Sequence, residues 1–482
     1  MELLRRDVRS ALSCGEGIKV LLLDDFTKNA LSPIVSHAEL LSCDFFLFEP
    51  ISRERCSISV ACVAILTKKS FPYLVCEIKS PKYKEYFVFI TDELSQEEIA
   101  SLAAQDSRGA IKELHELYLS AVLVDKSLFL LQHPSGCEKI RALLCALKGF
   151  GACPNVRYLF GSDVSYQIAS LISDAFSDEP FSNADLLVLD RTFDMLTPLC
   201  YPWTYQAMCA EYLSCSDSAV AWGPHRFYMT DEDPFFESTR FMDVVSATDF
   251  LSASLKEVRA SHDISGEFVA AIRQRAKNSE KHVIHLKALA EISKACVVND
   301  APSDLISEII LDGSVSVECV LSEEYTNEQK LRAALVSYLS LAVVPPASFS
   351  GIVWREEKQI SLIKNAFQKE IGAFNRIYMN GKCERKRPTF KKSLPLKLGY
   401  VPPVSRIVDK MKTGSLSASS YPYTRNKPGD RKTLIIYVAN GITLVEHMAI
   451  SELFARKYPK EECIIISDQI ITGKDVIRSV IG

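Results

Sequence analysis

Short apolar runs alternate with turn-rich or helical segments in the first part of the chain. They recur at intervals of roughly 20 to 25 residues, the rhythm of strands and helices in a parallel sheet. The pattern predicts a first α/β unit over residues 1–128, in which the fifth run closes the sheet. The five runs are Ile18–Leu23, Phe45–Phe48, Val60–Leu66, Phe87–Ile90 and Ala121–Leu131.

A second α/β unit is predicted from strands that lie far apart in the sequence. Residues 129–215 contain the strand-like runs Asn155–Tyr158 and Leu186–Leu189. Two more runs come late, Thr433–Val438 and Cys463–Ser467, with a helical pattern between them over Thr443–Lys457. The second sheet is therefore expected to be discontinuous, formed by residues 129–215 and 396–482.

The intervening residues 216–395 carry apolar side chains at three- and four-residue spacing, which favours helices. We expect a mainly helical inserted domain with a first part over about 216–320 and a second over about 321–395. The predicted fold class is thus α/β, with two Rossmann-like parallel-sheet domains and a helical insert. The expected helices are Asp249–Ala260, Ser265–Lys277, Glu280–Ala295, Asn327–Leu341 and Glu356–Phe374.

Composition argues against some classes of function but does not identify the function. The formal net charge of the 482 residues is -4, so the chain as a whole lacks the basic excess of a nucleic-acid-binding protein. Apolar runs such as Leu434–Ala439 and Ile464–Ile466 are far shorter than the roughly 20 residues of a membrane span. The start MELLRRDVRSALS lacks a signal-peptide core. We expect a cytosolic protein with no nucleic-acid partner.

The sequence contains no recognisable catalytic or cofactor motif. The patterns G-x-S-x-G, H-E-x-x-H, G-x-G-x-x-G and the P-loop are all missing, and the 15 cysteines form no C-x-x-C pair. His282 and His285 could share a helix face, but no further ligands are evident beside them. We therefore expect no catalytic residue, no metal and no cofactor.

The segment Leu186–Leu213, LLVLDRTFDMLTPLCYPWTYQAMCAEYL, joins a buried-strand signal to a polar turn and then to a helix. Asp190 and Arg191 stand where the strand leaves the sheet and can pair or cap locally. Asp194, Thr197 and Pro198 supply turn chemistry, and the helix is expected over Trp203–Leu213. We interpret Asp190, Arg191, Asp194 and Pro198 as a structural corner rather than a ligand site.

This segment resembles the signature of the SM (Sec/Munc) family, soluble partners of SNARE proteins in membrane fusion. Family members carry LDR-x-x-D-x-x-[ST]-P-L followed by a helix similar to [WF]TYQAM. The likeness extends over most of the chain in family order and is closest to the endosomal and trans-Golgi branch, the vacuolar protein sorting type. It includes GIKVLLLDDFTKNALSPIVSHAELLSCDFFLFEPI, SPKYKEYFVFITDELSQEEIASLAAQD, CPNVRYLFGSDVSYQIASLI and RKTLIIYVANGITLVEHMAISEL.

The resemblance implies an arch-shaped monomer whose central cleft holds a syntaxin-type (Qa) SNARE. Such a protein promotes or templates SNARE complex assembly in vesicle docking and fusion. It contacts the SNARE and Habc regions, the N-terminal peptide of the Qa SNARE, a vesicle (R) SNARE and the assembled complex. Localisation would be cytoplasmic and peripheral at endosomal and Golgi membranes.

An apolar pocket for the N-terminal peptide is implied on the outside of the first domain. Helical stripes leave a core role equally open, one formed by Ile99, Leu102 and Ala103 and another by Ile111 and Leu114. A carboxylate beside an apolar cup suits a basic peptide residue, although plain solvation also explains it. The pocket positions are Leu94, Ile99, Leu102, Ile111, Leu114 and Glu116.

The cleft contacts implied by the family fall on Ser36, Glu39 and Glu49, with Arg53 and Arg55 close behind. Ser36 stands where the exocytic branch has a basic residue, which favours looser or peptide-led SNARE binding.

In the helical insert, the likeness of HVIHLKAL places Val283 at a contact position of the R-SNARE template. Ser265–Lys281 lacks the proline that the family has at the bend of its hairpin, and the hairpin is expected to be shortened.

Several alternatives stay open at this point. The basic stretch Lys382–Lys392, KCERKRPTFKK, is either solvated surface or a contact for acidic SNARE surfaces or anionic lipids. Besides an SM protein of the endosomal branch, the chain could be an exocytic-branch SM protein, an enzyme with a degenerate α/β nucleotide site, or a scaffold that retains SM architecture.

Overall fold

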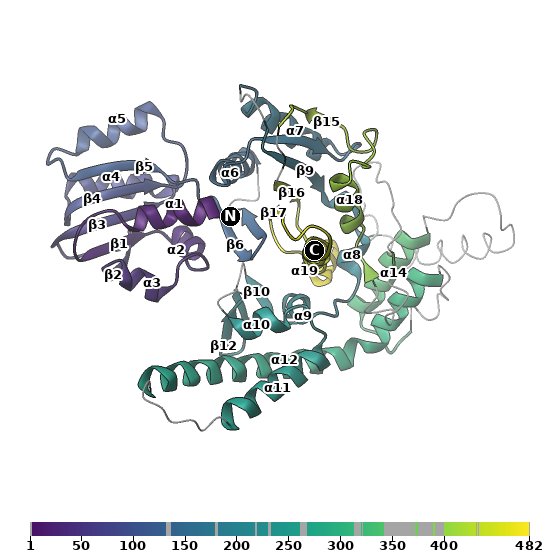
Figure 1. Cartoon of the computed structure of the whole chain (residues 1–482). Helices are drawn as coiled ribbons and strands as arrows, with labels where there is room; N and C mark the ends of the chain where they lie inside the picture. The colour runs from purple at the N-terminus through teal and green to yellow at the C-terminus, as the bar shows by residue number, and fades with distance from the viewer. Residues whose placement is uncertain are drawn as a thin grey trace.

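The computed structural model describes residues 2–131, 136–178, 182–216, 219–229, 233–260, 268–312, 320, 322–341, 369, 373–374, 389–390, 400–429, 431 and 433–481. A first sheet and a second sheet lie side by side, and a long helical hairpin runs beneath both (Figure 1). The predicted α/β fold class, with two parallel-sheet units and a mainly helical insert, is confirmed. Within these residues, no helix combines the length and apolarity needed to cross a membrane.

The first sheet has five parallel strands in the order β2-β1-β3-β4-β5. Helix α5 lies on the outer side of this sheet, above β5 in Figure 1. The elements are α1 (Glu2–Leu12), β1 (Lys19–Leu23), α2 (Asp25–Leu31), α3 (His37–Ser42), β2 (Phe45–Pro50), β3 (Ile58–Leu66), η1 (Lys68–Ser70), α4 (Phe71–Lys79), β4 (Tyr83–Ile90), α5 (Gln96–Gln105) and β5 (Ile111–Glu116).

Two expectations for the first sheet were wrong. The run Ala121–Leu131 does not close it; this run forms β6 (Ala121–Asp125) and β7 (Leu128–Leu131), an antiparallel pair at one edge of the second sheet. The true fifth strand is β5, in which Ile111 and Leu114 had suggested a helical stripe. A register shift opposite Tyr86 leaves one extra residue in β5, so side chains three apart face the same way.

The second sheet combines strands from both ends of the chain, in the order β15-β8-β9-β16-β17-β7-β6. Its five inner strands are parallel, and β15 and β6 are antiparallel edges. Its further elements are α6 (Gly136–Gly149), β8 (Pro154–Tyr158), α7 (Asp163–Ala175), β9 (Ala184–Asp190), η2 (Arg191–Phe193), α8 (Leu196–Leu199), α9 (Tyr205–Tyr212), α18 (Pro403–Lys412), β15 (Tyr423–Arg425), β16 (Thr433–Ala439), α19 (Leu444–Lys457), β17 (Glu462–Ser467) and α20 (Gly473–Ile481).

The inserted segment is mainly helical, and two of the helices expected there form a single helix. Helix α12 runs from Phe268 to Asp312 without a break, because no glycine or proline separates the two apolar patterns predicted there. The basic stretch 382–392 lies outside the described residues except for β13, and 356–374 lies outside except for residues 369, 373 and 374. The elements are β10 (Ser214–Ser216), β11 (Ala219–Trp222), β12 (His225–Tyr228), α10 (Pro234–Thr239), α11 (Val244–Ala260), α12, α14 (Asn327–Leu341), β13 (Thr389–Phe390) and β14 (Tyr400–Val401).

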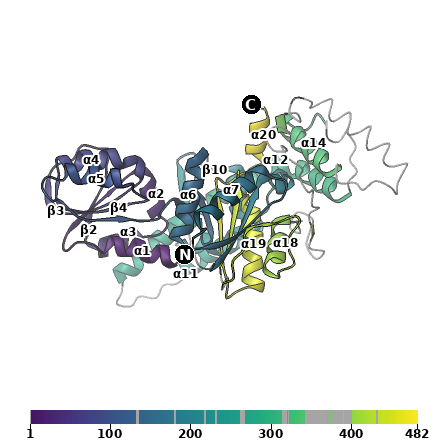
Figure 2. The same ribbon diagram turned by 90° about the horizontal axis from the view of Figure 1, so that it is seen from above.

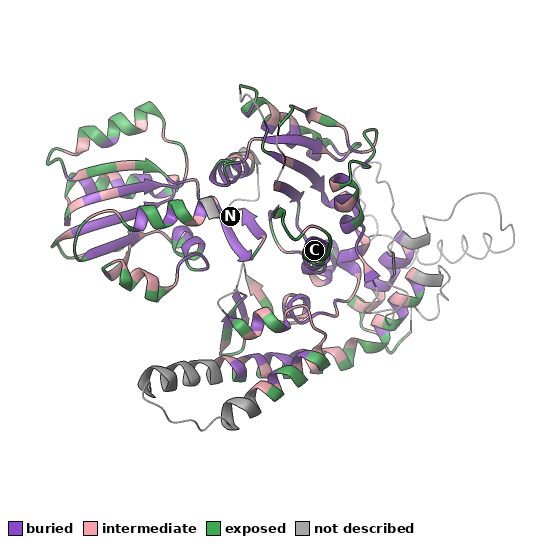
Figure 3. Cartoon of the chain, in the orientation of Figure 1, coloured by how far each residue is buried: buried purple, intermediate pink, exposed green. Residues whose placement is uncertain are grey.

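Apolar packing joins the two sheets and fastens the insert. One buried cluster runs from α1, α2 and one face of the first sheet into α6, α7 and one face of the second sheet. The opposite face of the second sheet packs against α9, α12, α18 and α19. Buried strands fill the centre of both sheets, while α3 and α5 present exposed faces (Figure 3). The first sheet and the second sheet therefore share a continuous core at their junction.

A buried polar cluster fastens α14 to the end of the chain. The Arg332 guanidinium donates to a Glu211 carboxylate oxygen at 2.6 Å and to the carbonyl oxygens of Leu199 and Cys200 at 2.7 and 2.9 Å. The other Glu211 oxygen accepts the Gly473 N–H at 3.0 Å. A Cβ on Gly473 would lie 2.2 Å from an Arg332 nitrogen, so the guanidinium fits only against glycine.

Gly473→Ala is therefore expected to destabilise the protein by about 1–3 kcal/mol, the usual cost of overpacking a filled site. Urea unfolding followed by circular dichroism measures the change. Arg478→Ala, an exposed position on the same helix α20, is the control and should change the unfolding free energy by about 0.5 kcal/mol or less. A Gly473→Ala variant as stable as this control would contradict the packing described for Arg332.

Candidate binding surfaces

A buried ion pair holds the corner between β9 and α9. The Arg191 guanidinium donates to both carboxylate oxygens of Glu446, at 2.7 and 2.8 Å, and each side chain is at most 1% exposed. Arg191 also donates to the carbonyl oxygens of Gly441 and Asp194 at 3.2 and 2.6 Å. Burial alone lowers the pKa of Arg191, but the Glu446 carboxylate outweighs it and raises the pKa above its usual value. This bidentate pair joins the corner to helix α19, 255 residues later in the chain.

The other polar residues of the corner are also used internally. Asp190 accepts hydrogen bonds from the backbone N–H of Thr192 and the hydroxyl groups of Thr192 and Ser162. Asp194 accepts from the N–H groups of Leu196 and Thr197 and from the Thr197 hydroxyl. Burial raises the pKa of Asp194. Pro198 is buried within α8.

Sequence reasoning expected Asp190 and Arg191 to pair or cap locally and missed Glu446. The signal for Glu446 was present in the chain as T-x-x-E, the capping-box pattern. Thr443 caps α19 and donates its N–H and hydroxyl to Glu446, at 2.9 and 3.0 Å. Glu446 therefore has two roles, in the cap of α19 and in the ion pair with Arg191.

Glu446→Gln should destabilise the protein by about 3–5 kcal/mol, because it leaves the Arg191 charge buried without its counter-ion. Thermal and urea unfolding measure this. Glu39→Gln is the matched control: Glu39 pairs with Arg9 at 2.7 Å at the surface, and its loss should cost about 1 kcal/mol or less. Equal stability of the two variants would contradict the weight given to the Arg191–Glu446 pair.

The residues expected to form the peptide pocket gather around α5 and β5. Leu102 is buried in the core beneath α5 at 1% exposure, so its contribution is structural. Leu94, Ile111 and Leu114 are half-buried and pack against that same core, whereas Ile99 is 42% exposed. Ile99 thus leaves apolar surface accessible on α5.

Glu116 is exposed at the end of β5 and ties the neighbouring loop to the strand. One carboxylate oxygen accepts the Leu94 N–H at 3.1 Å, and the other accepts the Tyr118 hydroxyl at 2.9 Å. Glu93, which precedes Leu94, is also exposed but pairs with Lys148. The carboxylate of Glu116 therefore orients Leu94 and remains accessible from solvent.

The residues implied for the cleft fall into two groups, and the first group is at least partly exposed. Ser36 caps α3 by accepting the Glu39 N–H at 3.2 Å. Glu39 pairs with Arg9 at the surface, and Arg53 is exposed. These positions face solvent and can contact a partner.

Arg55 and Glu49 instead belong to a network on the other side of β3. The Arg55 guanidinium is 5% exposed and donates to Glu77 at 2.7 Å, while Glu77 accepts the Tyr86 hydroxyl at 2.6 Å. Glu49 accepts the hydroxyl of Tyr83. The resemblance implied that Arg55 contacts a partner. Its side chain is instead paired within this unit, because Glu77 offers a buried counter-ion that sequence order did not reveal.

Val283 is 42% exposed on α12, whereas the two histidines beside it are fully buried. The ring of His285 lies 2.8 Å from the Tyr205 hydroxyl through Nδ1 and 3.2 Å from an Asp233 carboxylate oxygen through Nε2. Burial alone raises the pKa of Asp233, but the hydrogen bond and charge of His285 outweigh it, so the pKa is lowered. These contacts anchor α12 with Val283 outward. No cluster of metal ligands occurs in the described part of the chain.

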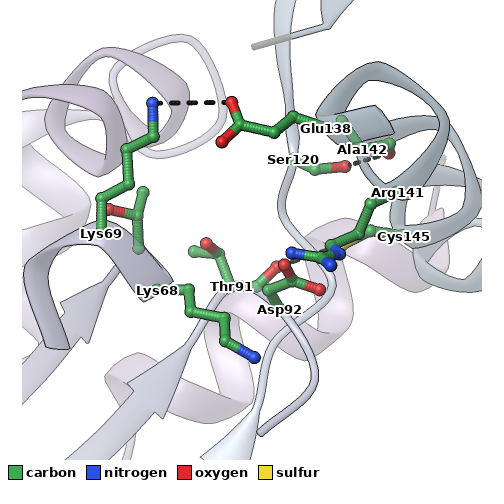
Figure 4. A pocket seen from close by; sticks show the side chains of 10 residues that line it. Lys68, Lys69, Thr91, Asp92, Ser120, Glu138, Arg141, Ala142 and Cys145 are labelled. Carbon is green, nitrogen blue, oxygen red and sulfur yellow. Dashed lines mark hydrogen bonds and ion pairs between the residues drawn. The ribbon is translucent and has the colours of Figure 1, made fainter. Parts of the chain in front are cut away.

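A crevice of about 240 Å³ separates the carboxyl ends of β3 and β4 from helix α6 (Figure 4). In doubly wound folds, ligands bind at such strand ends. Here the crevice is lined by charges of both signs, and Lys69 of the first sheet pairs with Glu138 of α6 across it at 3.9 Å. Burial raises the pKa of the Cys145 thiol to about 12, so this thiol is inert at neutral pH.

The point where the strand order reverses, between β1 and β3, is filled by the protein itself. The Asp24 carboxylate accepts the Thr67 N–H at 2.7 Å and the hydroxyl groups of Thr67 and Ser70 at 2.6 and 2.8 Å. It also accepts the Thr27 N–H at 2.9 Å. These donors are the groups that would hold a phosphate in a nucleotide site, and the side chain of Asp24 already uses them.

Two parallel sheets joined by shared core packing, with a helical insert anchored beneath them, define a three-part α/β architecture. Comparison with known proteins identifies its family. The model of the Sec1 family matches residues 19–479. The chain therefore belongs to the Sec1 family, and the resemblance to the Sec/Munc proteins is confirmed.

Relatives and solved structures agree with this assignment. Mouse vacuolar protein sorting-associated protein 45 is 30% identical over 232 residues, which span 43% of this chain and 40% of that protein. The Dictyostelium discoideum protein of the same name is 24% identical over 513 residues, covering 90% of this chain and 88% of that one. The solved structure of the SM protein Vps45 in complex with the Qa SNARE Tlg2 has a TM-score of 0.83 and 20% identity, covering 99% of this chain and 97% of that one.

Proposed function

We propose that this chain is an SM protein of the endosomal and trans-Golgi branch that binds a syntaxin-type Qa SNARE and promotes SNARE complex assembly. The observation that carries the proposal is the family match over residues 19–479. The structural neighbour that covers 99% of the chain was solved with a Qa SNARE bound, which supports the same partner class here. The likeness to vacuolar protein sorting-associated protein 45 supports the branch.

The physical task of such a protein is to hold SNARE helices in a geometry that they reach slowly alone. Binding surfaces on a rigid frame lower the ordering entropy that assembly must overcome. The partly exposed Ser36 and Glu39, the exposed Arg53, and Val283 on α12 are the proposed contacts for the Qa SNARE and the R SNARE. We assign binding rather than catalysis, and peripheral attachment to endosomal and Golgi membranes through the SNAREs.

The surface between α5 and β5 is the proposed site for the N-terminal peptide of the Qa SNARE. Ile99 offers exposed apolar area, with Ile111 and Leu114 half-buried beside it. Glu116 is fixed by Leu94 and Tyr118, so its carboxylate is held in place for a basic peptide residue. The apolar contact supplies affinity and the Glu116 carboxylate supplies orientation.

Ile99→Asp should weaken binding of this peptide at least about tenfold, because a charge replaces apolar burial worth roughly 1.5 kcal/mol or more. The measurement is isothermal titration of the chain with the cytosolic domain of an endosomal Qa SNARE, with and without its first dozen or so residues. Ile99 is chosen over Ile111 because its side chain is already exposed, so the fold is not disturbed.

Ile18→Asp is the matched control for Ile99→Asp. Ile18 is 61% exposed and precedes β1, three strands away from β5 in the first sheet. This variant should bind the Qa SNARE as the unaltered chain does. Equal affinity of the Ile99→Asp and Ile18→Asp variants would refute the assignment of the α5–β5 surface.

The same titrations separate the competing functions. A scaffold that keeps only the SM architecture would bind no syntaxin, and an exocytic-branch protein would bind a plasma-membrane syntaxin more tightly than an endosomal one. For an α/β enzyme, a nucleotide at a hundredfold its dissociation constant would add about 2.7 kcal/mol to stability. We expect no such stabilisation in a thermal-shift screen, in keeping with the use of the strand-end donors by Asp24.

A further inference from the structure

An apolar groove of about 500 Å³ lies between helices α18 and α19 on the second sheet. Its lining is largely apolar and includes Trp203, Val401, Met448, Leu453 and Ala455. Figure 2 shows α18 and α19 side by side on the part of the molecule away from the first sheet. The groove is thus separate from the α5–β5 surface and from the exposed positions on α3.

The charged side chains that make no ion pair near the rim of the groove are positive. Glu452 and Arg456 of α19 both line the opening, and Glu452 is engaged within the chain. Arg456 is exposed and makes no ion pair in the part of the chain that the structure describes. Two further exposed lysines, Lys410 on α18 and Lys460 in the turn after α19, likewise have no acidic partner within the described ranges.

Two neighbouring lysines, unlike Arg456, already have acidic partners. Lys457 pairs with Asp409 at 2.7 Å, and Lys412 pairs with Glu461. The hydrogen bond from Lys457 lowers the pKa of Asp409, and the charge of Arg456 adds to this effect. The charge of Arg456 therefore reaches Asp409, but Asp409 is paired with Lys457. Arg456 makes no ion pair of its own among the described residues.

The indole N–H of Trp203 is a hydrogen-bond donor within the apolar lining of the groove. This N–H is buried and has no hydrogen-bond acceptor among the described residues, whereas a buried donor of this kind normally has one. The indole also lies between this groove and a smaller cavity lined by Thr197, Tyr201 and Ile306. An occupant that brings a carbonyl or carboxylate oxygen to Trp203 would supply the missing acceptor.

We propose that the groove between α18 and α19 receives an acidic amphipathic segment of a partner protein. An apolar side chain of that segment enters between Met448 and Leu453, and its carboxylates face Arg456, Lys410 and Lys460. The stretch of this chain that precedes Tyr400 includes KCERKRPTFKK, whose charge has the same sign as the rim. Charge complementarity therefore favours an external acidic segment over the chain's own residues.

Two synthetic helical peptides of equal length test the proposal with the full chain. One has a leucine and phenylalanine face opposite a glutamate face, and the other has lysine at every glutamate position. Fluorescence anisotropy at low salt should show the acidic peptide binding at least about tenfold more tightly, with affinity that falls as salt screens the charges. Equal binding of the two peptides, or binding of neither, would overturn the proposal.

Three variants of the chain make the test specific to the groove. Arg456→Glu reverses the rim charge and Ala455→Trp covers the opening, and each should reduce affinity for the acidic peptide at least about tenfold. Arg478→Glu is the matched control, an exposed charge reversal on α20 that does not line the groove and should leave affinity unchanged. Unchanged affinity of the Ala455→Trp variant would place the peptide elsewhere and contradict the proposal.

Qa SNARE binding gives an independent readout for the same variants. Arg456→Glu should keep the affinity for the Qa SNARE cytosolic domain within about twofold while peptide binding is lost, because the two surfaces do not overlap. Loss of both activities in a variant that melts like the unaltered chain would show that the groove is part of the SNARE surface and would overturn the proposal of a separate partner. Failure of SNARE binding in the unaltered chain would count against the proposed function alone.

Discussion

The buried pair between Arg191 and Glu446 is the constraint on which the arrangement of this protein depends. It joins the corner after β9 to the first turn of α19, and thereby fixes where the late segment of the chain enters the second sheet. Strand β16 lies between β9 and β17, so the sheet is complete only when that late segment is in place. A buried ion pair of this kind contributes orientation more than net stability, since its attraction largely offsets the loss of hydration. Arg332 and Glu211 form a second buried ion pair, at the junction of α14, α9 and α20.

These internal pairings also bear on the proposed binding function, because they occupy the positions where a doubly wound sheet usually holds a ligand. The strand ends where a doubly wound sheet holds a ligand are occupied by the Asp24 carboxylate, and the crevice beside them is bridged by Lys69 and Glu138. Within the described residues, accessible apolar surface at the outer edges includes Ile99, Val283 on α12, and the groove beside Arg456. A packed centre with accessible groups at its periphery suits the proposed role, in which the protein holds partner helices in a fixed geometry.

The amino-acid sequence predicted the two sheets and the helical insert well, because strand runs such as Leu186–Leu189 and Thr433–Val438 are buried on both faces and read as uninterrupted apolar segments. Strand β5 was missed since a bulge gave Ile111 and Leu114 a helix-like spacing. The sheet to which β6 and β7 belong, and the pairing of Arg191 with Glu446, depend on contacts between distant segments that local patterns do not encode. For the same reason Arg55 was taken for a contact residue, although Glu77 holds it in the core.

Hydrogen–deuterium exchange, measured on the chain alone and with the cytosolic domain of an endosomal Qa SNARE, tests the account most directly. A rigid frame with peripheral binding surfaces predicts that added SNARE slows exchange at α5, β5, α3 and the exposed face of α12. The inner strands β9, β16 and β17 should stay equally protected in both states, because their opening requires breaking the core and the Arg191–Glu446 pair. Protection that appears only at the strand-end crevice, or a large change in the inner strands of the second sheet, would contradict it.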